Sequence, residues 1–198
     1  MKKEIREFEK QDLDACYEIY RYYVLNSVWN LDLKPDSREA FLKSIQDNPD
    51  FPFLVAVVDD QVIGYATAHH YRPKDGYQHA AELTLYFREG PHFGLASQIA
   101  DALSSVLKRQ NVRLEIGCIT ASNERSVAMN RRRGFEEYGR LKEAAWKNGA
   151  YHDVLWMKRS LQEPDFDPAE ELLPRFIPWS ELKKISPLEK ELSNPAKS

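Results

Sequence analysis

Residues 88–98, REGPHFGLASQ, combine two glycines with small polar side chains in a pattern suited to binding an anion. An apolar stretch typical of a strand precedes them, and a stretch of helical periodicity follows. Such a turn exposes several backbone N–H groups at the start of a helix, where the helix dipole adds to the attraction for negative charge. A pyrophosphate is one ligand that fits. Many strand-to-helix turns share this pattern, so an ordinary structural turn is the alternative.

Glu82 is the second feature of the sequence that could take part in a reaction. It lies in AAELTLYF, residues 80–87, between small and apolar neighbours. A carboxylate buried in a strand is costly unless it has a task or a partner. Ala80 and Thr84 share its face under the two-residue period of a strand. That period alone also allows a Glu82 that faces solvent.

The elements that must position these residues begin with the stretch 117–139, GCITASNERSVAMNRRRGFEEYG. It predicts a buried strand, a sharp turn, a short helix and a second strand. Ser122 and Asn123 can cap the helix, and Gly134 supplies a left-handed exit. The arginines at 131–133 suit the negative end of the helix dipole, and we expect them to be a solvated helix end.

Hydrophobic periodicity along the rest of the chain predicts a mixed α/β fold. We expect helices over residues 13–24, 36–47 and 94–110, and strands over residues 4–8, 53–59, 61–70, 80–87, 112–119, 135–141 and 151–161. Strands that first follow one another and then alternate with helices indicate a mixed sheet covered by helices on both faces.

Composition divides the chain into a domain over 1–161 and an extension over 162–198. Six of the eleven prolines fall within residues 164–195. Asp167 and Ser186 each precede a proline and an acidic residue at helix-start spacing, which predicts two short helices. Phe166, Phe176, Ile177 and Trp179 can be buried, so we expect the extension to pack on the domain or on a partner subunit. Partial disorder of the extension is the alternative.

Charge and cysteine content exclude several classes of protein. A net charge of −3 gives no basic field for nucleic acid. No signal peptide and no apolar run of about 20 residues is present, which argues against a membrane protein. Cys16 and Cys118 have no metal or disulfide spacing, so we expect reduced core residues of a cytoplasmic protein. Adjacent strand residues such as His69 and His70 face opposite sides, and we expect no metal.

Four stretches together resemble the GCN5-related N-acetyltransferases (GNAT), and most of all the branch that acetylates phosphinothricin or methionine sulfoximine. They are VLNSVWNLDLKPDS, YRPKDGYQHAAELTLYF, ASNERSVAMNRRRGF and WKNGAYHDVLWMKRSL. The last has the Gly-x-x-x-Asp-Val spacing of the branch's closing hairpin. The resemblance covers residues 4–161 and implies the GNAT fold, a central, mostly antiparallel sheet with helices on both faces.

The resemblance implies transfer of an acetyl group from acetyl-CoA to the amine of a small molecule. Glu82 would take the amine proton, directly or through water. Asn130 stands where many members carry a tyrosine acid and this branch often carries histidine. Asparagine cannot act as an acid, so either the thiolate leaves unaided or another group such as Tyr86 assists.

The same resemblance implies the residues that bind the cofactor. The family pattern Arg/Gln-x-x-Gly-x-Gly/Ala ends at Gly94 and Ala96, but Pro91 stands where its first residue is expected. Pro91 has no N–H, and His92 either replaces the lost polar contact or is simply solvated. The expected cofactor-binding residues are Phe87, through its backbone N–H, and Phe93, Gly94, Leu95, Ala96, Ser97, Asn123 and Ser126.

The acceptor side and the assembly are implied more loosely. Trp29, Arg72, Tyr77 and His79 lie in stretches that match acceptor loops, and Arg72 either clamps an acidic group or is a solvated loop residue. The branch usually forms homodimers. A protein, polyamine or antibiotic acceptor is the alternative within the fold, and a non-catalytic acyl-CoA-binding or interaction module is the alternative outside it.

Overall fold

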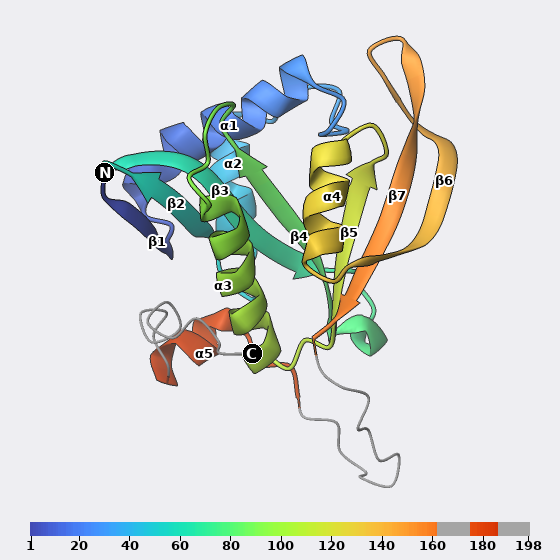
Figure 1. The fold of residues 1–198 in the computed structure, drawn as a ribbon. Helices are drawn as coiled ribbons and strands as arrows, with labels where there is room; N and C mark the ends of the chain where they lie inside the picture. Colours follow the sequence, from blue (N-terminus) through green and yellow to red (C-terminus); the bar gives the residue numbers. More distant parts are fainter. Residues whose placement is uncertain (162–174, 186–198) are drawn as a thin grey trace, which may run out of the picture.

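The computed structural model describes residues 1–161 and 175–185, which form one seven-stranded mixed sheet with helices on both faces (Figure 1). The strands run in the order β1-β2-β3-β4-β5-β7-β6, and only β4 and β5 are parallel. The strands are β1 (Lys3–Glu7), β2 (Leu54–Val58), β3 (Gln61–His70), β4 (Ala80–Phe87), β5 (Leu114–Thr120), β6 (Glu136–Lys147) and β7 (Ala150–Ser160). The helices are α1 (Leu13–Asn26), α2 (Arg38–Gln46), α3 (Leu95–Arg109), α4 (Glu124–Arg132) and α5 (Trp179–Ile185), with short 3-10 turns at Lys10–Asp12 and Asp75–Tyr77.

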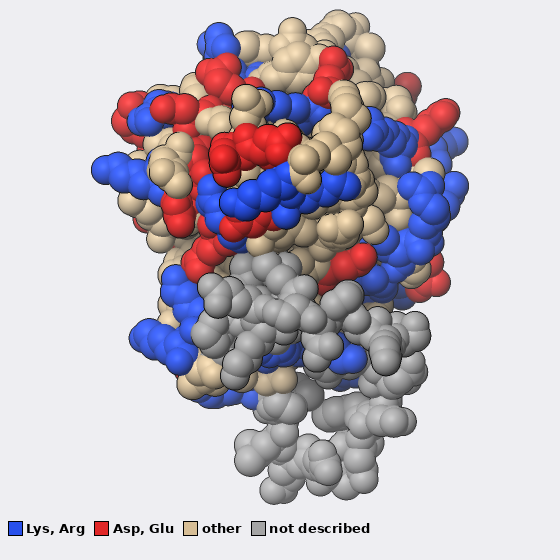
Figure 2. Space-filling model, turned by 60° about the vertical axis from the view of Figure 1, so that its left-hand side comes forward, with Lys and Arg blue, Asp and Glu red and all other residues tan. Residues whose placement is uncertain are grey.

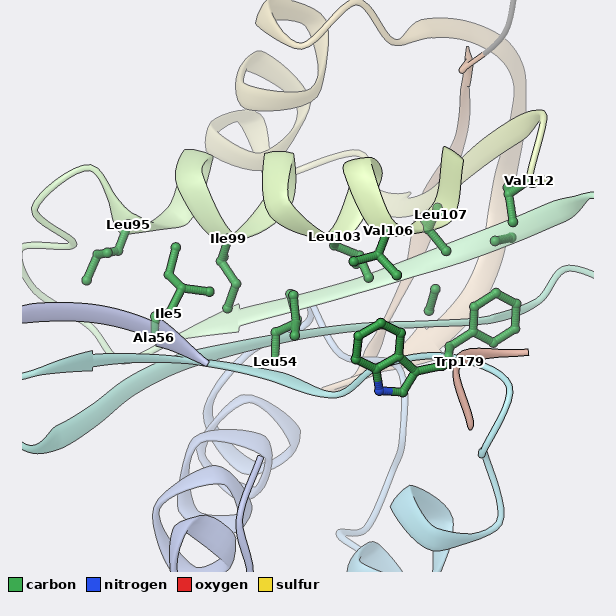
Figure 3. Close-up of a cluster of buried hydrophobic side chains, with 14 of the residues drawn as sticks. Ile5, Leu54, Ala56, Leu95, Ile99, Leu103, Val106, Leu107, Val112 and Trp179 are labelled. Carbon is green, nitrogen blue, oxygen red and sulfur yellow. The ribbon is translucent and has the colours of Figure 1, made fainter. Parts of the chain in front are cut away.

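The helices cover the sheet from two sides, as the periodicity predicts. Figure 1 shows α3 and α4 in front of the sheet and α1 and α2 behind it. In β2, Leu54 and Ala56 pack in the α3 core, whereas Val55 and Val57 pack in the α1 and α2 core. Alternate residues of a strand point to opposite faces, so a strand covered on both sides is apolar throughout. Figure 3 shows the apolar face of α3 directed at these strands.

The described part of the C-terminal extension adds apolar side chains to the α3 core. Trp179 and Leu182 of α5 are each only 3% exposed, and Figure 3 draws Trp179 near Leu54 and below Val106 of α3. The Trp179 indole N–H donates to the carboxylate of Glu7 at 3.0 Å. The helix starts predicted at Asp167 and Ser186 lie outside the described residues.

Two hairpin turns set the register of the sheet. Asp59 and Asp60 both have positive φ between β2 and β3, and Asn148 and Gly149 do so between β6 and β7. Left-handed residues at both central positions match the twist of a two-residue hairpin. The hairpin predicted at Asp59 is therefore confirmed.

Strand β6 runs to Lys147, beyond the end predicted at residue 141. Its pairing with β7 shifts register between Leu141 and Ala145, and Glu143 has a positive φ of 50°. The carboxylate of Asp153 accepts the Glu143 N–H at 2.9 Å and holds this bulge. The extra residues of the bulge break the alternation that marks a strand, which is why the pattern hides the outer half of β6.

Arg133 is not a solvated helix end, contrary to the prediction. Its side chain is 6% exposed and donates to Ser104 and to the Ala100 carbonyl of α3. The fully buried Glu115 accepts hydrogen bonds from Ser104 and from Arg159 of β7. Buried charges persist only when paired and hydrogen-bonded, and this network ties α3, α4, β5 and β7 together.

The surface is mixed in charge. On the face drawn in Figure 2, Lys and Arg intermingle with Asp and Glu. This agrees with the small net charge of −3. Within residues 1–161 and 175–185, no helix has the length and apolar character required to span a bilayer.

Lys147, at the tip of the β6–β7 hairpin, anchors the loop after α1. The residue is 3% exposed, and its ammonium group donates to the carbonyls of Val24, Asn30 and Asp32 at 2.7–2.8 Å. All three of its N–H donors are therefore used. The Val24 carbonyl belongs to the last turn of α1, where carbonyls lack helical partners and favour a cation. Burial lowers the pKa of Lys147.

Lys147→Met keeps the length of this side chain and removes its hydrogen bonds. A hydrogen bond to a charged group contributes about 1.5–3 kcal/mol, so we expect amide hydrogen exchange in residues 27–32 to rise about tenfold or more. Exchange measured by mass spectrometry checks this. Lys142→Met, an exposed lysine of the same hairpin, is the control. Equal exchange in both variants would show that Lys147 does not order the loop.

Candidate functional site

The sheet opens between its two parallel strands. Pairing of β4 with β5 stops at Glu82 and Ile116, although β4 continues to Phe87 and β5 to Thr120. Figure 1 shows the two strands separating beyond that point, with α4 beside the gap. A gap in a paired sheet leaves backbone groups and side chains of both strands available to a ligand.

The gap holds a hollow of about 230 Å3, called here the strand cavity. It is lined by residues 82–86 of β4, 117–120 of β5, 29–31 of the loop after α1, and by α4. The Thr120 hydroxyl donates to the Val28 carbonyl at 2.8 Å and so closes the loop over the cavity. The loop that Lys147 anchors is thus one wall of the cavity.

Glu82 lies where the strands part and faces this cavity. Its side chain is 20% exposed, and its Oε2 lies 3.8 Å from Nε2 of His69 on the neighbouring strand β3. The sequence left both a buried and a solvent-facing Glu82 open. The structure places it at the cavity wall, with one carboxylate oxygen near a titratable imidazole.

The two adjacent histidines have different partners. His69 faces Glu82, whereas His70 Nε2 lies 2.8 Å from Asp50 and its ring packs on Phe51. The predicted opposite orientation is confirmed. The described residues contain no group of three metal-binding side chains.

Cys118 is not a core residue, contrary to the prediction. It is exposed and lines the strand cavity, whereas Cys16 is fully buried as predicted. The partial burial of its thiol, with the nearby charge of Glu82, raises the pKa of Cys118 to about 11. Beyond the end of the β4–β5 pairing, a strand residue faces the cavity rather than a packed neighbour, and the sequence pattern does not mark that point.

Tyr86 contacts both the strand cavity and the groove described below. Its ring packs on Tyr23 and Tyr65, with centroids 4.9 and 5.8 Å away. Burial raises the pKa of Tyr86 to about 12, although a hydrogen bond with Asn30 acts in the opposite direction. The phenol is therefore protonated at neutral pH and able to donate a proton.

The backbone N–H of Phe87 faces the gap. The N–H of Arg88 donates to the Ile63 carbonyl of β3 at 2.8 Å. Neighbouring residues in an antiparallel ladder direct their N–H groups to opposite edges, so Phe87 directs its N–H away from β3. The Tyr23 hydroxyl donates to the Phe87 carbonyl at 2.7 Å and fixes the strand end. A carbonyl oxygen in the gap would find a hydrogen-bond donor here.

Helix α4 brings three of the predicted residues to the gap. Asn123 caps it, since its Oδ1 accepts the Ser126 N–H at 3.1 Å. Asn130 is buried, and its Nδ2 donates to the Ser126 carbonyl at 3.0 Å. One amide hydrogen of Asn130 is thus committed to its own helix, while the side chain still lines the strand cavity.

The turn before α3 adopts the left-handed shape expected of its glycine. Phe93 and Gly94 have φ of 51° and 83°. The amide of Leu95 is not available, contrary to the prediction, because it donates to the His92 carbonyl at 2.8 Å. Ala96 and Ser97 hold the second and third helical positions, whose N–H groups have no acceptor within a helix.

The N-terminus of α3, the end of β4 and α4 enclose a second hollow of about 480 Å3, called here the arginine groove. Of the predicted residues, Phe87, Gly94, Ala96, Ser97, Asn123 and Ser126 line it, whereas Phe93 and Leu95 do not. Three arginines, at 125, 132 and 133, also line the groove, and no carboxylate does. A site of this charge attracts an anion.

The sequence prediction missed Arg125 and Arg132 and left the role of His92 open. Arg125, Met129 and Arg132 recur at helical spacing on α4, and all line the groove. Their spacing places these three residues on one face of α4, and this pattern could have identified them in the sequence. The run of arginines at 131–133 instead suggested a solvated helix end. His92 is not a solvated loop residue, since its ring bonds to Arg88 and Arg125.

Of the residues predicted to bind the acceptor, the structure brings only Trp29 to the site, where it lines both hollows. Arg72 stacks on Tyr71, with its guanidinium carbon 4.3 Å from the ring centroid, and Tyr77 packs on the same ring. The Nδ1 of His79 bonds to the Asn111 carbonyl at 2.8 Å. None of these three lines the strand cavity.

Residues 5–156 match the family described as "Acetyltransferase (GNAT) domain". The phosphinothricin N-acetyltransferase of Streptomyces coelicolor is 29% identical over 164 residues, which cover 80% of this chain and 96% of that protein. The crystal structure of a phosphinothricin acetyltransferase from Sinorhizobium meliloti in complex with AcCoA aligns with a TM-score of 0.78 and 29% identity, covering 88% of this chain and 97% of that chain.

A ribosomal-protein-alanine N-acetyltransferase from Brucella melitensis is similar too, with a TM-score of 0.76 and 31% identity over 79% of this chain and 99% of that chain. The mixed sheet that opens between β4 and β5, the capped helix α4 and the family match agree with the GNAT fold expected from the motifs. The chain belongs to the GCN5-related N-acetyltransferases and is an N-acetyltransferase.

Proposed function

We propose that this chain transfers the acetyl group of acetyl-CoA to the primary amine of a small amino acid or amino-acid analogue, in the manner of its phosphinothricin-acetylating relatives. The observation that carries the proposal is the gap between β4 and β5. Glu82 stands at its closed end, and the Phe87 N–H faces it from the same strand. One edge thus presents a proton acceptor and a carbonyl-binding donor.

Glu82 acts as the general base. A strand rises about 3.3 Å per residue, so Glu82 and Phe87 lie roughly 16 Å apart along β4. We therefore expect a chain of hydrogen-bonded water molecules in the strand cavity to carry the proton from the amine to Glu82. The Phe87 N–H stabilises the negative charge that develops on the carbonyl oxygen.

Tyr86 is the side chain that this arrangement favours for stabilising the leaving group. A phenol whose pKa is raised to about 12 keeps its proton at neutral pH, and it can stabilise a departing thiolate by donating a hydrogen bond. The amide of Asn130 can donate a hydrogen bond to a thiolate but cannot transfer a proton to it. One of its two amide hydrogens is already donated to the Ser126 carbonyl. We assign Asn130 to binding beside the sulfur.

The arginine groove fits coenzyme A. When bound, acetyl-CoA supplies an acetyl group already activated as a thioester. The free amides of Ala96 and Ser97 lie at the start of α3, where a phosphate is favoured. Arg125 and Arg132 add positive charge, whereas Arg133, the third arginine of the groove, pairs with Asp101. Asn123 and Ser126 line the groove between the phosphate end and the gap, where a pantetheine arm would lie.

The strand cavity favours a small acceptor. Its volume of about 230 Å3 lies below the range of roughly 300–1,000 Å3 typical of pockets for drug-sized ligands. Trp29 and Leu31 give it an apolar wall, and Asn30 and Glu82 give it polar groups. An amino acid matches this size and polarity.

A protein N-terminus is the second candidate, because a similar structure is that of a ribosomal-protein-alanine N-acetyltransferase. A thiol-release screen with acetyl-CoA separates the two. It compares phosphinothricin, methionine sulfoximine and common amino acids with polyamines and peptides that begin with alanine. Turnover of peptides alone would overturn the small acceptor. Failure to bind acetyl-CoA at millimolar concentration in calorimetry would overturn the enzyme itself.

Glu82→Gln tests the base. Loss of a general base costs roughly 10²–10⁴-fold in rate, so we expect kcat/KM at pH 7 to fall by about that factor. The defect should shrink as the pH rises, because the amine then loses its proton unaided. Initial rates of thiol release between pH 6 and 10 check this.

The matched control for this substitution is Glu136→Gln, which changes an exposed glutamate of β6. Both variants should bind acetyl-CoA like the wild type in calorimetry. A Glu82→Gln enzyme with normal kcat/KM at pH 7 would refute the assignment.

We further propose that the chain forms a homodimer and works in the cytoplasm, without nucleic acid or membrane as partner. The net charge of −3 supports the lack of a nucleic-acid partner. Four large apolar side chains, Tyr138, Leu141, Trp146 and Tyr151, are 44–63% exposed on the β6–β7 hairpin. Strand β6 is also the edge of the sheet. Exposed apolar groups on an open edge are typical of an interface.

The double variant Trp146→Asp and Tyr151→Asp should be monomeric, because two buried charges at an apolar interface oppose association. Light scattering after size exclusion gives the mass, which should halve relative to the wild type. The control is Lys142→Asp in the same hairpin. A wild-type protein of monomer mass at micromolar concentration contradicts the dimer.

A further inference from the structure

The phosphate-binding turn has fewer donors than the family pattern supplies. Pro91 replaces the polar first residue of that pattern and has no N–H. The Leu95 N–H is occupied by the His92 carbonyl. The amides of Gly94, Ala96 and Ser97 remain along the groove. These donors are neutral, so a doubly charged pyrophosphate would gain from a cationic partner elsewhere in the groove.

Arg125, the second residue of α4, lies across the arginine groove from that turn. Its Nη2 is 2.9 Å from Nδ1 of His92, and Nε2 of His92 is 2.9 Å from the Arg88 carbonyl. A guanidinium can only donate, so Nδ1 accepts from Arg125 and the hydrogen on Nε2 is donated to Arg88. The imidazole links α4 to the turn between β4 and α3.

The surroundings of His92 favour the neutral imidazole, which is the form that can accept a hydrogen bond from Arg125. Burial, together with the positive charge of Arg125, lowers the pKa of His92. The ring packs on Phe87, with centroids 4.7 Å apart, which fixes its plane. A neutral His92 orients Arg125 without cancelling its positive charge, whereas a carboxylate partner would cancel it.

Arg125 has donors left for a ligand. Among residues 1–161 and 175–185 it has no carboxylate partner, and its side chain is exposed at the groove. A guanidinium has five N–H donors, and one of them serves His92. The rest match phosphate oxygens, which arginine binds in bidentate geometry.

We propose that Arg125 binds the pyrophosphate of coenzyme A and that His92 is the residue that positions it. The pair takes over the contact that Pro91 removes from the turn. The inference rests on acetyl-CoA being the donor, and it adds a phosphate-binding residue on α4, opposite the α3 turn.

Calorimetric titration with three ligands tests it: coenzyme A, dephospho-coenzyme A, which lacks only the 3′-phosphate, and acetyl-pantetheine, which has no phosphate. Arg125→Ala should raise the Kd about tenfold or more for the first two and leave the third unchanged. A tenfold change corresponds to about 1.4 kcal/mol. Arg131→Ala, an exposed arginine of the same helix that pairs with Glu137, is the control and should bind all three normally.

His92→Ala should raise the Kd for coenzyme A by a smaller factor, and that factor should disappear in an Arg125→Ala background. Such coupling marks a residue that acts through another. Thermal unfolding checks that each variant is folded. Arg125→Lys keeps the positive charge but lacks the paired N–H donors of a guanidinium, so it should bind coenzyme A more tightly than Arg125→Ala and more weakly than the wild type.

Three results would overturn the proposal. They are an unchanged Kd for coenzyme A in Arg125→Ala, an equal loss for acetyl-pantetheine, and a loss that vanishes with dephospho-coenzyme A. In each case the wild type still binds acetyl-CoA, so the proposed function stands. A wild type that binds none of the three ligands would remove the function as well.

Discussion

The site depends on the point at which β4 and β5 stop pairing. Up to Glu82 and Ile116 the two strands form an ordinary parallel ladder. Beyond it, backbone donors of β4 and side chains of both strands face a hollow instead of each other. Unpaired donors inside a protein cost free energy, so such a gap persists only where the surroundings hold it open or a ligand satisfies it.

Three sets of contacts hold the strands apart. The hydroxyl of Tyr23 fixes the end of β4 through the Phe87 carbonyl. Lys147 and Thr120 keep the loop after α1 over the mouth of the gap. At the base, the buried Glu115 accepts from Ser104 and Arg159, and Ser104 also accepts from Arg133, which ties β5 and β7 to α3 and α4. These polar side chains are bonded within the protein, which fixes the scaffold and leaves Arg125 and Arg132 of the groove to meet a ligand.

Much of the scaffold could be predicted from local patterns. The apolar run of β2 and the period of α3 mark elements whose side chains meet one large core. The cap at Asn123 and the turn at Asp59 are local chemistry and were predicted correctly. Glu82 and the α4 module were located by resemblance to the family, and the structure brings them to one gap.

Two of the failures come from contacts that are distant in sequence, and a third comes from a contact inside one turn. Lys147 acts on carbonyls more than a hundred residues away. Arg133 is buried against α3, where it donates to Ser104 and to the Ala100 carbonyl, 29 and 33 residues earlier in the chain. The Leu95 amide is lost to a carbonyl within its own tight turn. Arg72 stacks on Tyr71 and His79 bonds to Asn111, and their role in acceptor binding stays a prediction. None of these contacts produces a hydrophobic periodicity or a motif that could be recognised in the sequence.

A crystal structure with bound coenzyme A would show whether the gap between β4 and β5 is the reaction site. We expect the pantetheine arm to lie in the gap, with its thiol beside Tyr86 and Asn130. The Phe87 N–H should lie within hydrogen-bond distance of the ligand or of the acyl group it carries. A cofactor bound elsewhere, with β4 and β5 closed into a continuous ladder, would exclude the gap as the reaction site.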